Sequence, residues 1–221
     1  MRASLVSRAL VAVMLLAGCR EPDQAFTQEF GESPAEFATT GRNPFFVLEP
    51  GHQLILEDGA ERLVISVQSD TALVDGVWTR VVEERETVDG QLKEVSRNFF
   101  AISRRSGSVY YFGEDVDIYD GGAISSHEGA WRSGVDGARY GLMMPAVALL
   151  GARYQQETAP GIAMDRAAIV ALDDTLTTPA GRFDRLIRVE ETTPLEPGVR
   201  EFKWYAAGVG LVRDGSLRLV R

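Results

Sequence analysis

The chain has only one cysteine, Cys19, and only two histidines, His52 and His127, among its 221 residues. A single cysteine cannot form a disulfide within the chain, so the fold must depend on its core. Two distant histidines without a second cysteine are a poor set of zinc ligands. The chain also lacks a Gly-x-Ser-x-Gly segment, the turn on which α/β-hydrolases carry their nucleophile. We therefore expect no zinc site and no catalytic residues.

Long apolar runs and long helical periods are missing as well. A permanent membrane helix needs about 20 apolar residues, and the run over residues 9–16 is much shorter. No segment shows a long 3.6-residue period, so the crossover helices that a parallel sheet requires are absent from the pattern. The net charge of −9 disfavours nucleic acid as a partner, because the chain would repel a phosphate backbone.

What the chain does contain is a two-residue period from about residue 43 onward. Runs of β-branched and aromatic residues alternate with polar ones, as in residues 201–205. Asp-Gly pairs separate these runs, and Asp-Gly favours the tight turns of β-hairpins. The clearest case is a hairpin of residues 77–88 and 91–102 around Asp89-Gly90. The pattern predicts an all-β fold with little helix, an antiparallel meander forming a curved sheet or an open barrel.

The N-terminus resembles the export signal of bacterial lipoproteins. Arg2 and Arg8 precede the apolar run, and Leu16-Ala17-Gly18-Cys19 resembles the lipobox of that family. The resemblance implies cleavage before Cys19, attachment of acyl chains such as palmitate there, and anchoring in the membrane. Arg20, where an aspartate would imply the inner membrane, favours the outer membrane facing the periplasm.

We thus expect three parts: a signal peptide over 1–18, a lipidated flexible tether over 19–43, and an antiparallel β domain over 44–221. The tether is inferred from its Pro, Gly, Ser and acidic residues, which show no sustained period. We further expect the apolar stretch 142–150 to be a loop packed over an open end of the sheet.

Several turns resemble those of a group of bacterial secreted proteins and lipoproteins. Residues 43–51 read Asn-Pro-Phe-x-x-Leu-x-Pro-Gly and residues 179–183 read Pro-Ala-Gly-x-Phe, the two motifs by which we compare the chain with this group. The resemblance covers roughly residues 43–212. It implies an exported antiparallel β domain, and it implies no activity.

Three local patterns suggest chemistry, and each has a simpler interpretation. Ser125-Ser126-His127-Glu128 could orient an imidazole, yet such a string in a turn is usually solvated. Residues 114–120 carry four carboxylates before a glycine turn, which partly resembles a calcium loop but lacks its spacing. An exposed strand edge explains that pattern as well, so we expect no metal.

Adjacent carboxylates occur at Glu83-Glu84, Asp173-Asp174 and Glu190-Glu191. Neighbours on a strand point to opposite faces, so they cannot flank one bond as a glycosidase requires. We expect them to form exposed acidic faces. The three tryptophans, at positions 78, 131 and 204, belong to the core or line a binding mouth, and aromatic residues on alternating strands are more often found in the core.

These observations favour a non-enzymatic, lipid-anchored protein of the bacterial cell envelope that needs no cofactor. Its β domain is expected to bind an apolar small molecule or an envelope protein, besides the membrane to which the lipid attaches. The alternatives are a structural or assembly partner that docks through a sheet edge and a hydrolase with an unrecognised site.

Overall fold

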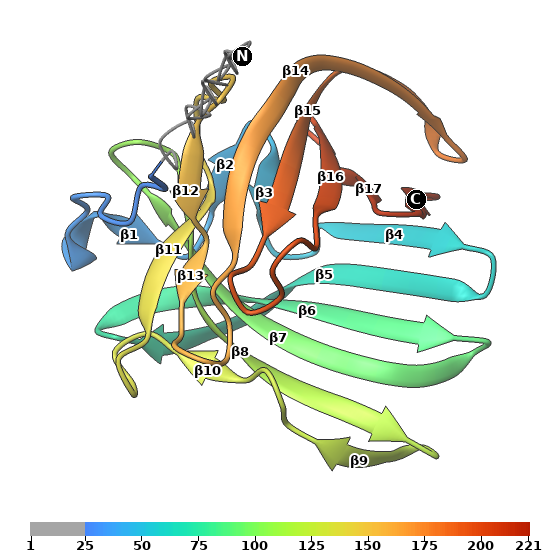
Figure 1. Cartoon of the computed structure of the whole chain (residues 1–221), viewed down its shortest axis with the longest axis horizontal. Coiled ribbons are helices and arrows are strands. Elements are labelled where there is room, and N and C mark those ends of the chain that lie inside the picture. The colour runs from blue at the N-terminus through green and yellow to red at the C-terminus, as the bar shows by residue number, and fades with distance from the viewer. Residues whose placement is uncertain (1–24) are drawn as a thin grey trace, which may run out of the picture.

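The computed structural model describes residues 25–221, which form an all-β fold (Figure 1). Apart from the single 3-10 turn η1 (Pro34–Glu36), every regular element in this part of the chain is a strand. The strands are β1 (Phe37–Ala38), β2 (Gly41–Asn43), β3 (Phe46–Leu48), β4 (Gln53–Asp58), β5 (Glu61–Val74), β6 (Val77–Val88), β7 (Gln91–Ser103), β8 (Val109–Asp120), β9 (Ala123–Ser126), β10 (Trp131–Arg132), β11 (Arg139–Met144), β12 (Arg153–Gln155), β13 (Glu157–Thr158), β14 (Arg166–Thr178), β15 (Gly181–Thr192), β16 (Glu201–Ala206), β17 (Gly210–Asp214) and β18 (Leu217–Leu219).

One antiparallel sheet contains most of these strands and curves into a nearly closed barrel with one unsealed seam. The strand order is β12-β14-β15-β16-β17-β18-β4-β5-β6-β7-β8-β11-β13, so most neighbours in space are also neighbours in sequence. Strand β1 adds to β7, strands β9 and β10 add to β8, and β2 pairs with β3 apart from the main sheet. The expected antiparallel meander is confirmed, and its open-barrel form is the one adopted.

The two ends of the sheet meet in a single stretch of chain, residues 153–158. Its first half pairs with β14 and its second half with β11. Strand β11 comes so close that a Cβ on Gly141 would lie 2.5 Å from the carbonyl oxygens of Gln155 and Gln156. Only glycine fits this approach, which brings the barrel near to closure.

The Asp-Gly pairs produce the hairpins that the sequence predicts. Strands β6 and β7 pair from Val88 and Gln91 onward, with Asp89 at φ 51° and Gly90 at φ 74°. Two consecutive residues with positive φ define the type I′ turn that matches the twist of paired strands. The same geometry recurs at Asp75-Gly76 between β5 and β6. The predicted hairpin of residues 77–88 and 91–102 is therefore confirmed.

The hydrophobic core lies between the two sides of the curved sheet. Its largest fully buried side chains come from strands throughout the chain: Phe112, Leu48, Leu56, Met144, Ile169 and Leu186. Phe37 and Tyr140 pack against the Phe112 ring, with centroid distances of 5.2 and 4.6 Å. Aromatic pairs at such distances add stabilisation to the area they bury. No helix within residues 25–221 is long and apolar enough to cross a membrane.

The folded part of the chain begins well before residue 44, inside the range expected to be a tether. Phe37 is buried in the core, and the main-chain amide of Thr27 donates to the carbonyl of Arg153. The Glu32 carboxylate accepts hydrogen bonds from Ser103 and Tyr110. The tether expectation for 27–43 is corrected, because these contacts could not be read from residues without a period; residues 1–24, with Cys19, lie outside the described part.

The apolar stretch 142–150 is also different from the expected packed loop. Its first three residues belong to β11, with Leu142 and Met144 in the core. Beyond Pro145 the chain turns outward and exposes Val147, Leu149 and Leu150. The strand extends further than expected because Leu142 and Met144 alternate inward with the period of β11.

Candidate functional site

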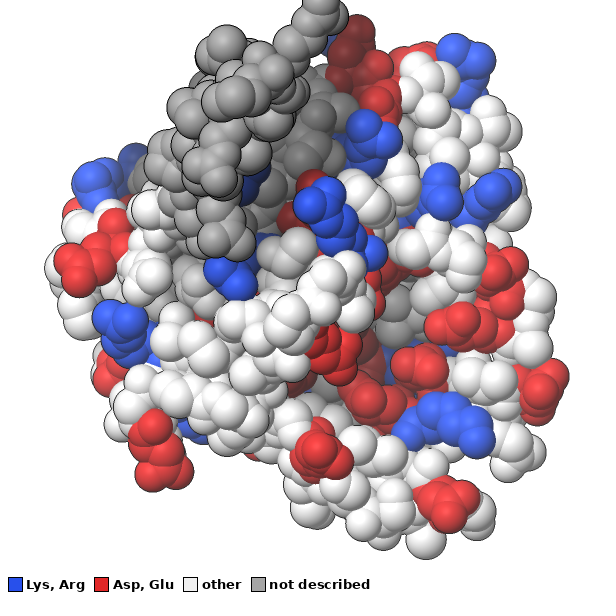
Figure 2. Space-filling view, viewed as in Figure 1, with Lys and Arg blue, Asp and Glu red and all other residues white. Residues whose placement is uncertain are grey.

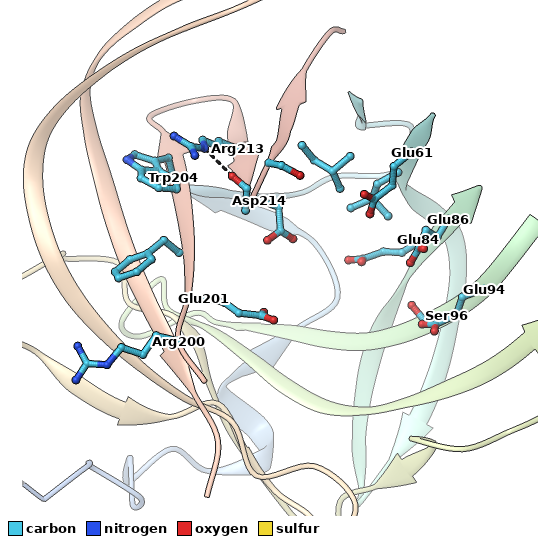
Figure 3. A pocket seen from close by; sticks show the side chains of 15 residues that line it. Glu61, Glu84, Glu86, Glu94, Ser96, Arg200, Glu201, Trp204, Arg213 and Asp214 are labelled. Carbon is cyan, nitrogen blue, oxygen red and sulfur yellow. Dashed lines mark hydrogen bonds between the residues drawn. The ribbon is translucent and has the colours of Figure 1, made fainter. Parts of the chain in front are cut away.

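The barrel opens into a cleft of about 550 Å³ between two walls of strands. Strands β5, β6 and β7 form one wall, and β16 and β17 form the other (Figure 3). In the space-filling view, acidic side chains gather in a hollow right of centre (Figure 2). The residues that line the cleft are mostly polar: Glu61, Leu63, Glu84, Glu86, Glu94, Ser96, Arg200, Glu201, Phe202, Trp204, Arg213, Asp214, Gly215, Ser216 and Leu217.

Strand alternation places the carboxylates of the first wall. On β6, Glu84 and Glu86 have the same parity as the buried Val82 and point to the inside with it. On β7, Glu94 lies directly opposite Glu86 in the antiparallel register. Like charges facing each other across two strands destabilise a sheet. Burial raises the pKa of Glu94, and the neighbouring Glu86 raises it further.

Glu84 is the most perturbed carboxyl group of this wall. Burial raises its pKa to about 7, with smaller contributions from Asp214 and Glu94 that Lys203 opposes. Within residues 25–221 its carboxylate has no hydrogen bond and no ion pair, although its neighbour Glu83 contacts arginines on the outer face. Glu84 is therefore a half-buried acid that faces the cleft without a partner.

The opposite wall carries Lys203, one of two lysines in the chain. Its Nζ lies 2.8 Å from Glu191 Oε2 and 3.8 Å from Asp214 Oδ2. Burial opposes the charge on Lys203, yet the two carboxylates raise its pKa well above the usual value. Gln156 Nε2 donates to the other oxygen of Glu191 at 2.9 Å. This lysine is thus already neutralised by its neighbours.

The two arginines of the cleft are also engaged elsewhere. Arg200 pairs with Glu190 at 3.2 Å, and Arg213 lies over the Trp204 ring at 4.2 Å from its centroid. Arg213 Nε donates to the carbonyl of Gly215. The cleft consequently keeps an excess of carboxylates over cations, and low-dielectric walls strengthen the resulting negative field.

The floor of the cleft is a small apolar chamber of about 70 Å³ that shares Glu84 and Asp214 with the cleft and also contains Lys203. Aromatic and aliphatic side chains line it, among them Phe46, Phe100, Met143, Tyr205 and Leu211. The site is thus amphipathic, with acid at the mouth and a narrow apolar end.

A second hollow of about 350 Å³ continues beyond Glu201, which lines both. It contains Glu114, whose pKa burial raises to about 7, with Glu84 adding to the effect. Asp165 and Glu191 lie in the same hollow, and burial raises the pKa of Asp165. The excess of negative charge therefore extends along the opening.

The expectation that the carboxylate pairs form exposed acidic faces is wrong for two of the three. Glu84 and Glu191 turn into the barrel, while Glu83 and Glu190 remain at its outer side. Alternation separates the two members of one pair, but it does not prevent members of different pairs from lying close together. Glu84 on β6 and Glu191 on β15 are such residues. The two-residue period of β6 could have identified Glu84, because it lies two residues after the buried Val82 and therefore on the same, inner face of the strand.

The sequence motifs at the histidines and at residues 114–120 do not converge on one site. His127 Nδ1 contacts the carbonyl of Val116 at 2.8 Å and Asp117 at 3.0 Å, and no serine hydroxyl bonds to its ring within residues 25–221. Asp117 also pairs with Arg97 at 3.0 Å. No group of three His, Cys, Asp or Glu in the described part of the chain is placed to hold a metal.

The tryptophans divide among three environments. Trp131 is buried as expected, whereas Trp204 lines the cleft and Trp78 is 59% exposed. The core expectation is wrong for Trp78 because it lies beside the Asp75-Gly76 turn, where the hairpin extends past the core. Trp78 lies opposite Leu73 in the register of β5 and β6, and both side chains are 59% exposed.

Comparison with known proteins adds no family to this description. No family model matches the chain, and neither a curated protein nor a solved structure matches it. The resemblances in residues 16–19, 43–51 and 179–183 stay predictions.

Proposed function

We propose that the chain is a non-enzymatic binding protein of the bacterial envelope, held by a lipid on Cys19, and that its cleft binds a small organic cation with an apolar group. The observation that supports the ligand class is Glu84, a carboxyl group that faces the cleft and makes no ion pair or hydrogen bond within residues 25–221, where the nearby Lys203 pairs with Glu191 instead. A bound ammonium group would supply that partner through charge-assisted hydrogen bonds.

The charges of the cleft favour a cation over the wholly apolar ligand expected from the fold class. Glu86 and Glu94 lie opposite each other on neighbouring strands, and their repulsion lowers the stability of the sheet. The fold itself does not need two acidic residues at this pair of positions. A cation between the walls would relieve that repulsion, since it favours the ionised form of each carboxyl group. The volume of about 550 Å³ falls in the range of small-molecule sites.

The apolar part of such a ligand has a place at the floor of the cleft. The chamber of about 70 Å³ admits only a small apolar group, such as a short alkyl chain or part of a ring. Arg213 already covers the face of the Trp204 ring, at 4.2 Å from its centroid, so this ring is not assigned to the ligand. An amine joined to a small apolar group therefore fits both ends of the site.

Isothermal titration calorimetry with phenethylammonium tests the proposal, and the uncharged phenethyl alcohol is the matched control ligand. We expect the amine to bind and the alcohol to bind at least tenfold more weakly, because hydrogen bonds to charged groups contribute about 1.5–3 kcal/mol. Affinity should rise as the pH increases through about 7, since Glu84 ionises there.

The variant Glu84→Gln should weaken amine binding by about 10- to 100-fold and remove most of the pH dependence. Glu83→Gln is the matched control, because it removes the same charge from the outer face of the same strand. Equal affinity for the amine and the alcohol, or equal losses in both variants, would contradict the proposal.

A further inference from the structure

A turn after β11 exposes three large aliphatic side chains together. Val147 is 70% exposed, Leu149 63% and Leu150 65%. Pro145 begins this turn, and Gly151 ends it with a φ of +82°. We call residues 145–151 the apolar loop. Adjacent exposed aliphatic residues of this size mark a surface that contacts a protein or a membrane.

Two arginines lie on the strand that follows the apolar loop and on its neighbour: Arg153 on β12 and Arg166 on β14. Arg153 and Arg166 both approach the ring of Phe26, at 5.7 and 5.0 Å from its centroid. No carboxylate of the described chain pairs with either arginine, and the buried Nε of Arg166 has no hydrogen-bond partner there. Glu190, the carboxylate that lines the same hollow as both arginines, pairs with Arg200 instead. Both arginines therefore keep their positive charge at the Phe26 ring, and Arg153 lies two residues after the apolar loop.

This face lies next to the point where the described chain begins. The Thr27 amide donates to the carbonyl of Arg153, and the amide of Ala152 donates to Leu149. Cys19 precedes Thr27 by eight residues, which can span at most about 29 Å. A lipid on Cys19 would therefore keep this face within a short distance of the bilayer.

We propose that the apolar loop and Arg153 and Arg166 form a membrane-contact face, with the aliphatic side chains in the acyl boundary and the arginines at anionic headgroups. The inference rests on the lipid anchor of the proposed function. Apolar insertion and attraction to anionic lipid together strengthen binding at a bilayer surface. We assign a lipid surface to this face because the exposed aliphatic side chains match the acyl region of a bilayer and the arginines match its anionic headgroups.

The geometry also explains why an acidic chain can approach anionic lipid. Six carboxylates line the cleft between β5–β7 and β16–β17, whereas the apolar loop is at the end of the barrel above β12 (Figure 1). Contact through the loop leaves the mouth of the cleft open to solvent. The surface potential of the membrane falls off within about one Debye length, so it acts on the near arginines and little on the distant carboxylates.

The test uses the full-length protein purified from membranes and reconstituted into vesicles of phosphatidylglycerol and phosphatidylcholine. Val147→Cys carries an environment-sensitive fluorophore, and Val135→Cys is the matched control, since Val135 is 52% exposed and lies before β11 where Val147 lies after it. Lipid-borne quenchers then report contact. We expect strong quenching and a blue shift at position 147 and neither at position 135.

Charge dependence separates the membrane face from a general apolar patch. Arg153→Gln together with Arg166→Gln should reduce the quenching at position 147, as should vesicles of phosphatidylcholine alone, because about 1 kcal/mol of attraction per arginine is removed. Equal quenching at the two labelled positions, or quenching at position 135 alone, would overturn the proposal.

A separate measurement tests whether Cys19 carries the lipid anchor. Mass spectrometry of the N-terminal peptide shows whether Cys19 carries acyl chains. If it does not, the same labelled protein is mixed with preformed vesicles, and the difference between positions 147 and 135 still decides the contact. Absence of that difference refutes the membrane face, whether or not the lipid is present.

Discussion

Replacing Glu84 by glutamine should stabilise the protein at pH 8 and not at pH 4.5. The folded protein raises the pKa of this carboxyl group from 4.5 to about 7, because burial disfavours its charge. The folded state therefore binds the proton more tightly than the unfolded chain. Ionisation between these two pKa values favours unfolding, so this contribution to stability is greatest at low pH and is lost as the pH rises through 7.

The magnitude follows from the two pKa values. At 1.36 kcal/mol per pKa unit, the difference corresponds to about 3 kcal/mol of destabilisation above pH 7. Glutamine abolishes the ionisation, and its amide carries a cost that is the same at both pH values. We expect Glu84→Gln to gain about 3 kcal/mol at pH 8 relative to its effect at pH 4.5.

Urea denaturation of both proteins at the two pH values measures this difference. A gain of this size raises the midpoint by roughly 1–1.5 M when the slope is about 2–3 kcal/mol/M. Comparing the two pH values cancels the cost of the amide, which is the same at both. Glu83→Gln, on the outer face of β6, should show no such pH-dependent gain. A Glu84→Gln effect that is equal at both pH values would refute an abnormal pKa at this site.

Three further predictions follow from the anchor, the buried cation and the seam. Cys19→Ala should move the protein from the membrane fraction to the soluble periplasmic fraction, and retention in the membrane would contradict a lipid at this residue. Lys203→Met should lower the free energy of unfolding at pH 7 by about 3–5 kcal/mol, because it leaves its carboxylate partners without a cation; a near-neutral effect in urea denaturation would show that they do not depend on it. Gly141→Ala should cost about 1–3 kcal/mol through overpacking against Gln155, and an unchanged melting temperature would contradict so close an approach.

The local part of the fold could be predicted because it depends on neighbours in sequence. Asp89-Gly90 fixes both the turn and the register of β6 and β7, and two-residue alternation identifies the strands on either side. The absence of helical periods gave the all-β class in the same way. These signals need no knowledge of distant contacts.

The cleft could not be predicted because it depends on how far the sheet curves. Glu84 meets Asp214 only when β6 and β17 face each other across the barrel, and nothing in either strand specifies that distance. Residues 27–43 were misjudged for a similar reason, since Glu32 is held by Ser103 and Tyr110, about 70 residues later in the chain. Long-range contacts of single polar groups leave no period in a sequence.

The pairing of β18 with β4 imposes an order on assembly. Arg218 lies opposite Glu57, so the two strands that join the halves of the barrel are about 160 residues apart in the chain. If the chain were exported from its N-terminus, β4 to β8 would emerge from the membrane first. The edge of β4 would then stay unpaired until β18 had also emerged. If the chain is exported as proposed, the crossing of β18 would decide when the exposed edge disappears, and a chaperone would have to act before that moment.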